Sequence, residues 1–348
     1  MAHQPMHIND WIEIDSDYTW YIHEKTRVIN EQGKHVIDSL PENDDACNEL
    51  LELLVNWLPK RYPKLFANIG KDGIWNKVIN ERFEHTKDVY GVDALKIISR
   101  LVQDDFLMAR EREDGHIYFV GGLVAFPGFY LLSEKINMSL EQAHAPVPYF
   151  NEKLLKSVER VLKRFGPNEP FERTSWEIVD DRNLFFHNIS KTGSTVPEEL
   201  HPKDLFFRVD HQTFRKLRRS KGIIFGVRPV LKRLEDFADS PLLPALLARV
   251  HTQADRELMN ASIPISFSVG ISLTSFLMQY KLAPMYQDKL IPYLEELHAE
   301  QMRKGLIKLS VSADFRSLVE EPPSTQTSLR NPTESEIRMT RGSMGADL

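Results

Sequence analysis

Residues 106–123, Phe-Leu-Met-Ala-Arg-Glu-Arg-Glu-Asp-Gly-His-Ile-Tyr-Phe-Val-Gly-Gly-Leu, predict the first pair of strands in this protein. Two strand-like segments, Phe106–Ala109 and His116–Leu123, lie on either side of the charged segment Arg110–Gly115. That segment ends in Asp-Gly, a strong hairpin turn, because glycine tolerates positive φ. The stretch therefore predicts an antiparallel hairpin.

Three later segments have the same character, namely Arg173–Val179, Leu205–Val209 and Ile223–Val230. The last of them places Ile223, Phe225 and Val227 on one face, since side chains alternate along a strand. Together with the hairpin, they predict an antiparallel sheet of five strands.

Helices are expected around this sheet. The first hundred residues have helical periodicity, and Pro63 ends a helix because it disfavours the helical conformation at Tyr62. The apolar spacing of three and four residues is typical of amphipathic helices, and it recurs at Ala46–Trp57, Val92–Val102, Asn151–Phe165 and Leu243–Val250. The pattern predicts an α+β protein with extensive flanking helices.

The composition predicts one domain, residues 1–319, followed by a disordered tail at residues 320–348 that is rich in Pro, Ser, Thr, Asn and charges. The chain has 348 residues, 42% hydrophobic and 27% charged, with a net charge of −6. This balance argues against a nucleic-acid partner. The longest apolar-looking stretch, Ser262–Tyr280, is too rich in serine to span a membrane.

The cellular compartment is inferred from the number of cysteines and from the N-terminal sequence. Cys47 is the single cysteine, so no intrachain disulfide can form, and one thiol cannot hold an iron–sulfur cluster. The first fifteen residues lack the basic region and apolar run of a secretory signal. We therefore expect a cytoplasmic protein.

Common catalytic motifs are absent from the sequence, including G-x-G-x-x-G, the P-loop, H-E-x-x-H and G-x-S-x-G. His298 and Glu300 form an H-x-E triplet, but it lies in a helical pattern where residues two apart point to different sides. They are not expected to share a metal ion. Cys47 has acidic neighbours that oppose thiolate formation, so we expect a buried helix thiol rather than a haem ligand.

Several strings resemble one protein family. Glu134-Lys135-Ile136, followed by Ser139-Leu140-Glu141-Gln142-Ala143-His144-Ala145-Pro146-Val147-Pro148, resembles the family's E-K-x…L…I-H-x-P-V-P segment. Arg208-Val209-Asp210-His211-Gln212-Thr213-Phe214-Arg215-Lys216-Leu217 is similar to its R-V-x-x-Q-T-L-R-R-L string. Weaker matches keep the family's order from about residue 11 to residue 280. The family comprises the α-subunit-like proteins of haem-dependent oxidative N-demethylases.

This resemblance implies a PAS-like antiparallel sheet wrapped in helices, with haem b between sheet and helices. It also implies an oxygen-activating, monooxygenase-like oxidoreductase, in which ferrous haem binds dioxygen and a secondary amine is oxidised to the demethylated amine and formaldehyde. The substrate would be a small organic molecule, an amine or a biosynthetic intermediate. Because the chain has no flavin or nicotinamide fingerprint, electrons would arrive from a separate reductase, a small reductant or the substrate.

The resemblance also selects candidate site residues. His144 is the expected axial iron ligand, held by a rigid segment that contains Pro146 and Pro148. His211 is the alternative ligand, although many relatives carry Arg at its position. His211 and Gln212 are candidate catalytic donors, since hydrogen bonds stabilise charge that develops on dioxygen.

Three arginines complete the set of candidates. Arg173, Arg208 and Arg228 match arginine positions of the family and could pair with the haem propionates, and Arg228 also counts among the catalytic candidates. Surface salt bridges are the alternative for each. Trp176 is a candidate wall of the cofactor pocket, with a role as a core aromatic as its alternative.

Other functions stay open from the sequence. The cationic run Arg215–Lys221 is interpreted as a solvated turn, with docking of an acidic redox partner as the alternative. The whole chain could be a haem-binding PAS sensor or carrier without turnover, although no output module is evident. It could also be a silent relative that binds another ligand or a partner protein.

Overall fold

The predicted hairpin is present in the computed structural model. Strands β6 (Asp105–Glu111) and β7 (Ile117–Leu123) pair antiparallel. The backbone N–H of Gly115 donates to the carbonyl of Arg112 at 2.9 Å, and Gly115 has a φ of 77°. A positive φ is the reason that glycine is needed in this turn.

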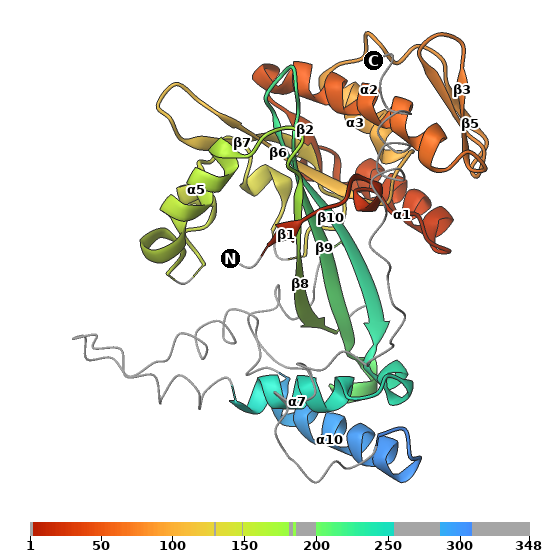
Figure 1. Ribbon diagram of the computed structural model, residues 1–348, viewed down its shortest axis with the longest axis vertical. Coiled ribbons are helices and arrows are strands. Elements are labelled where there is room, and N and C mark those ends of the chain that lie inside the picture. Colours follow the sequence, from red (N-terminus) through yellow and green to blue (C-terminus); the bar gives the residue numbers. More distant parts are fainter. Residues whose placement is uncertain are drawn as a thin grey trace, which may run out of the picture. The chain divides into compact units, whose positions relative to one another are not determined.

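Seven strands, not five, form the main sheet, in the order β1-β8-β9-β10-β6-β7-β2 with every neighbour antiparallel (Figure 1). The remaining five are β1 (Gln4–Pro5), β2 (Ile37–Ser39), β8 (Phe171–Val179), β9 (Phe206–Lys216) and β10 (Ile223–Arg233). The two strands that the periodicity did not predict, β1 and β2, are edge strands of two and three residues. Strands this short show no alternation of polar and apolar residues.

The first hundred residues are also not all helical, contrary to the expectation from their periodicity. A second sheet of three antiparallel strands lies there, made of β3 (Phe66–Ile69), β4 (Gly73–Asn76) and β5 (Glu81–Phe83). Each strand has only three or four residues, so its register depends on turns rather than on a long periodic pattern.

The structure describes residues 3–128, 130–147, 149–180, 184–185, 200–253 and 286–307. All of them belong to one unit, Met1–Ile307. The predicted boundary at residue 319, the tail at 320–348, the stretch Ser262–Tyr280 and Pro148 lie outside the described residues. None of the described helices is both long and apolar enough to cross a membrane.

The described α-helices include a counterpart for each of the four predicted helical segments. They are α1 (Tyr18–Gln32), α2 (Asp44–Arg61), α3 (Gly91–Ser99), α4 (Leu140–Ala143), α5 (Leu155–Arg164), α7 (Leu243–Gln253) and α10 (Gln287–Arg303). Helix α2 ends at Arg61 with Tyr62 as its C-cap, directly before Pro63, as the sequence predicts.

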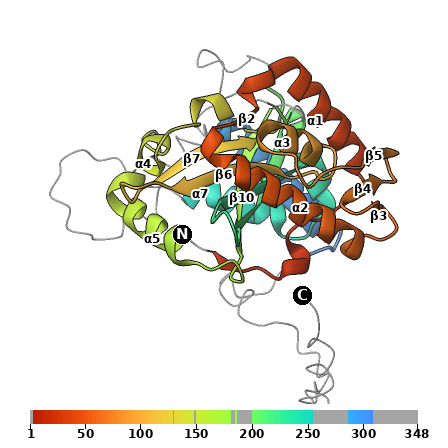
Figure 2. The same ribbon diagram turned by 90° about the horizontal axis from the view of Figure 1, so that it is seen from above.

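The two faces of the main sheet pack against different helices. Cross-strand partners share a face, so the registers place Leu107, Phe214 and Phe225 on one side, and these side chains belong to a core cluster with residues of α4 and α5. We call this side the α5 face. Figures 1 and 2 show α5 on one side of β6 and β7 and α2 on the other.

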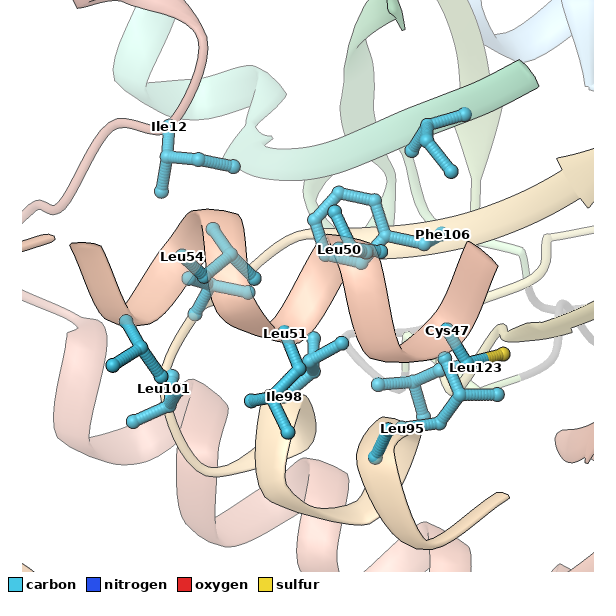
Figure 3. Close-up of a cluster of buried hydrophobic side chains, with 14 of the residues drawn as sticks. Ile12, Cys47, Leu50, Leu51, Leu54, Leu95, Ile98, Leu101, Phe106 and Leu123 are labelled. Carbon is cyan, nitrogen blue, oxygen red and sulfur yellow. The ribbon is translucent and has the colours of Figure 1, made fainter. Parts of the chain in front are cut away.

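The opposite side, the α2 face, carries the largest core. Phe106 of β6 contacts the cluster formed by α2 and α3, and Figure 3 shows Leu50 turned toward Phe106 and Leu51 toward Ile98 of α3. At the far end of β8, β9 and β10, helices α7 and α10 close a third cluster with Ile178 and Leu205 (Figure 1). Each face therefore has its own apolar packing.

The cationic run begins in the last two residues of β9, Arg215 and Lys216, and continues through the turn that leads to β10. One carboxylate of α2, that of Glu49, accepts backbone hydrogen bonds from Arg218 at 2.9 Å, Arg219 at 3.0 Å and Ser220 at 2.8 Å. Burial alone would raise the pKa of Glu49, but these hydrogen bonds outweigh it, so the pKa lies below its ordinary value. The turn is thus bound to α2 by a charge-assisted contact.

We predict that Glu49→Gln lowers the free energy of unfolding by about 2–3 kcal/mol, because buried N–H groups lose a charged acceptor. Urea denaturation at pH 7 measures the loss. The stabilisation is present above the ordinary glutamate pKa and disappears as pH falls through the lower, folded-state pKa. The control is Glu52→Gln, whose exposed pair with Arg219 is worth less than about 1 kcal/mol. Equal losses in the two variants would contradict this assignment.

Candidate functional site

His144 lies directly after the short helix α4, on the α5 face. Ser139 and Gln142 form a capping box that starts this helix, with Ser139 Oγ accepting from the Gln142 backbone at 3.2 Å. The imidazole stacks on Phe150, with ring centroids 4.1 Å apart and planes 15° apart. Phe119 of β7 lies 6.3 Å from the same ring. The imidazole is therefore held between strand and helix by aromatic contacts.

The hydrogen bonding of His144 selects one tautomer. Its Nδ1 lies 2.9 Å from the carbonyl oxygen of Leu140, so Nδ1 carries the proton in the neutral ring. Burial lowers the pKa of His144, although this backbone contact opposes the shift. A neutral imidazole with Nδ1–H bound to a carbonyl presents the lone pair of Nε2, which is the usual arrangement of a metal-ligating histidine.

Arg173 and Gln212 occupy the same face as His144. They are cross-strand partners in β8 and β9, and Arg173 Nε donates to Gln212 Oε1 at 2.6 Å. The Arg173 guanidinium also lies 5.5 Å from the centroid of Phe214. Its charge is one of those that lower the pKa of His144. Three of the predicted site residues are thus brought together.

Arg208 lies on this face too, but it belongs to a buried network of charges. Its guanidinium, 1% exposed, contacts Asp210 at 2.8 Å and Glu177 at 3.3 Å, and donates to the Phe126 carbonyl at 2.8 Å. Two carboxylates therefore already neutralise the Arg208 guanidinium, with which a haem propionate would otherwise pair. Arg208 stabilises the loop after β7 rather than lying open to a ligand.

His211, Arg228 and Trp176 lie on the α2 face, across the sheet from His144. His211 and Arg228 are cross-strand partners, and each is paired with acid: His211 Nε2 with Glu172 at 2.9 Å, and Arg228 with Glu13 and Asp15. Both line a cleft of ≈ 500 Å³. The sheet therefore divides the predicted site residues into two groups.

Trp176 packs in the core near α7. Its ring stacks on Phe207 with centroids 5.8 Å apart and lies 5.8 Å from His251. It belongs with the cluster of α7 and α10. This position matches the core alternative for Trp176.

The two faces differ in how well they fit a haem. The α5 face offers a neutral imidazole, stacked aromatics and the cation of Arg173, which suit an apolar macrocycle with anionic propionates. The cleft on the α2 face is lined by Asp10, Glu13 and Glu172, which would repel propionates. The residues on the α5 face therefore fit the group better than those that line the cleft.

Other metal ligands considered from the sequence do not form a site. Burial raises the pKa of Cys47 to about 12, and its thiol contacts Asn43 Nδ2 at 3.2 Å, so it stays protonated. Glu300 pairs with Lys304 at 2.7 Å along α10 instead of meeting His298. Within the described ranges, no three acidic, His or Cys side chains gather as a metal site.

We predict that Phe150→Ala raises the pKa of His144 toward its ordinary value of about 6.5, because solvent reaches the ring. The imidazole signals in a pH titration by nuclear magnetic resonance report this shift. The control Phe83→Ala removes a phenyl ring from β5, in the other core cluster, and should leave the titration unchanged. An unaltered His144 titration in Phe150→Ala would show that stacking does not shield the ring.

One family model matches the chain across residues 2–263, and its description is haem-dependent oxidative N-demethylase, alpha subunit-like. The match includes every strand of both sheets and all seven residues considered for the site. The chain therefore belongs to the α-subunit-like family of haem-dependent oxidative N-demethylases.

Proposed function

We propose that this protein is a haem-dependent oxidoreductase that activates dioxygen to oxidise a small organic substrate, such as an amine or a biosynthetic intermediate. The observation that supports this proposal most directly is His144, whose Nδ1–Leu140 contact and lowered pKa prepare Nε2 as a ligand. Family membership supplies the cofactor class. The proposal includes a PAS-like character for the antiparallel sheet.

In this proposal the α5 face holds haem b. His144 would bind the iron and Arg173 would pair with a propionate, while Phe150 holds the imidazole in place by stacking. The haem, when bound, supplies the capacity to bind dioxygen and oxidise a nearby carbon–hydrogen bond. Phe119 and Phe214 exclude water from this side of the sheet, since both are less than a tenth exposed.

Gln212 is the proposed polar contact for substrate or dioxygen. Its amide oxygen accepts from Arg173, which orients the amide and leaves the NH₂ group as donor on the α5 face. His211 and Arg228 lie on the other side of the sheet, so the proposal assigns them no part in the reaction.

The reaction needs an electron source outside this chain. Oxidation of an N-methyl group consumes one dioxygen, two electrons and two protons, and yields the demethylated amine, formaldehyde and water. We propose a separate reductase as the donor. The turn Arg215–Lys221 stays a candidate docking surface, although Arg219 pairs with Glu52 and Arg218 donates to Asn168.

We predict that His144→Ala weakens haem binding by roughly 100-fold or more. Removing only the hydrogen-bond partner of a metal ligand already lowers metal affinity by about 10- to 100-fold, and removing the ligand itself should cost more. Haem titration followed by absorbance measures the affinity, and the Soret band should shift on reduction and again with carbon monoxide in the unmodified protein. Binding should weaken as pH falls through the lowered pKa of His144, because a protonated imidazole cannot ligate iron.

The matched control is His211→Ala, which removes an imidazole from the opposite face. This variant should keep haem content and the Soret band. If His211→Ala loses haem and His144→Ala does not, the ligand assignment is reversed. Haem binding without substrate oxidation by any reduced preparation would favour the sensor or carrier function.

We further predict that Arg173→Leu lowers haem affinity by about 10-fold, the effect of losing one charge-assisted contact of about 1.5 kcal/mol. The same titration measures it. Arg228→Leu removes a cation of similar burial from the other face and should leave haem affinity unchanged. Equal losses in both variants would indicate a general effect on folding rather than contact with a propionate.

A further inference from the structure

The cleft on the α2 face is assembled from the sheet and the segment that crosses it. Asp10 and Glu13 come from the N-terminal segment, and the floor is formed by β8, β9 and β10. The lining residues are Asp10, Glu13, Glu172, Thr174, Val209, His211, Arg228 and Val230, and the volume is ≈ 500 Å³. This volume is within the usual range for a small-molecule site.

A row of polar side chains crosses the floor of this cleft. Thr174, His211 and Arg228 are successive cross-strand partners in β8, β9 and β10. Val227 pairs with Asp105, so continuing that register by one residue puts Asp104 beside Arg228, on the same side of the sheet. The field of Arg228 and that of His211 both act on the Asp104 carboxylate. Asp104 therefore ends the row beneath the cleft.

Two groups in this row lack hydrogen-bond partners within the part of the chain that the structure describes. They are Oδ2 of Asp104, a residue 1% exposed, and Nε of Arg228. Burial raises the pKa of Asp104 to about 6, against the opposing charges of Arg228, Lys25 and His211. At neutral pH this carboxylate is mostly ionised, and a buried carboxylate oxygen without a donor costs free energy.

The charge of the cleft is negative. Arg228 is shared between Glu13 and Asp15, and His211 faces Glu172. The remaining acid, Asp10, has no ion pair with any described residue. Three carboxylates and one guanidinium line the walls beside His211, and this excess of acid attracts a cation and disfavours an anion.

The walls also carry an apolar part, formed by Val209 and Val230. Val230 is 41% exposed although it is a valine in the middle of a long strand. A ligand with a short hydrocarbon portion would cover it. No three acidic or His side chains converge on a metal position among the described residues, so a cation with several N–H donors matches the spread of charge better than a bare ion.

We propose that this cleft binds a small organic cation with N–H donors, an ammonium or guanidinium compound with a short alkyl part. Asp10, Glu13 and Glu172 supply the charge, Thr174 and His211 supply polar contacts, and Val209 with Val230 contacts the alkyl part. The site lies across the sheet from His144. It is distinct from the proposed haem site and does not depend on it.

The test uses the full-length protein and two probes, propylammonium and propylguanidinium, at constant ionic strength, with neutral 1-propanol as the uncharged comparison. Calorimetry measures affinity, and amide resonances of Val209, Thr174 and Val230 report position. We expect saturable binding of one cation per chain and no binding of 1-propanol. Glu172→Gln and Asp10→Asn should each weaken affinity about 10-fold, the loss of one charge-assisted contact.

Matched variants distinguish binding in the cleft from binding at the haem face or at scattered surface carboxylates. Glu295→Gln removes an exposed carboxylate from α10 and should bind the probes as the unmodified protein does. His144→Ala should also bind the probes normally. The test of the cleft therefore remains valid even if the haem proposal fails. Circular dichroism confirms folding of each variant.

Three outcomes would overturn the proposal. One is a non-saturating response spread over all surface carboxylates. Another is unchanged affinity in folded Glu172→Gln and Asp10→Asn. The third is displacement of the probes by magnesium or calcium at lower concentration, which would identify an inorganic cation site instead.

Discussion

Strand β9 turns Gln212 toward one side of the main sheet and His211 toward the other, and this alternation determines the chemistry of both faces. Cross-strand partners share a face, so Arg173 of β8 lies on the same side as Gln212, and Arg228 of β10 lies on the same side as His211. The two groups cannot meet, because the backbone hydrogen bonds of the sheet lie between them. A slip of one residue in the pairing would exchange the groups.

Buried charged side chains hold α1 and the loop after β7 against the main sheet. Lys25 of α1, which is fully buried, contacts Asp105 at 3.2 Å and donates to the carbonyls of Val102, Gln103 and Asp104. Arg208 binds the loop after β7 through the Phe126 carbonyl. Such pairs cost desolvation and stabilise little by themselves, but a partner left alone in the interior would be far more costly. They therefore favour one arrangement of α1, this loop and the sheet.

The same separation of faces gives the molecule two environments of opposite character. Around His144 the ring stacks on Phe150, and burial keeps the imidazole neutral. Around His211 the cleft is acidic, and the histidine is already paired with Glu172. An anionic, apolar cofactor suits the first environment and an organic cation suits the second. Two histidines of one chain thus have different surroundings, because their neighbours come from opposite faces of the sheet.

This division was not predicted from the sequence. The predicted strand Leu205–Val209 ends before His211 and Gln212, whereas β9 continues to Lys216. Adjacent residues in a strand point to opposite faces, so the two side chains cannot serve one site. Periodicity located the five longer strands and the helix that ends before Pro63. It missed β1 and β2 and the small sheet, because strands of two to four residues carry too few alternations to stand out.

The sequence by itself determined the class of fold, the hairpin at Asp114-Gly115 and, through the order of its strings, membership of the family. Tertiary structure alone decided which groups each arginine contacts. Arg208 and Arg173 look alike in sequence, yet one is neutralised by Asp210 and Glu177 and the other contacts Gln212 and Phe214. The reason is that the charge available at a site depends on neighbours from distant segments, and a linear sequence does not record how those segments pair.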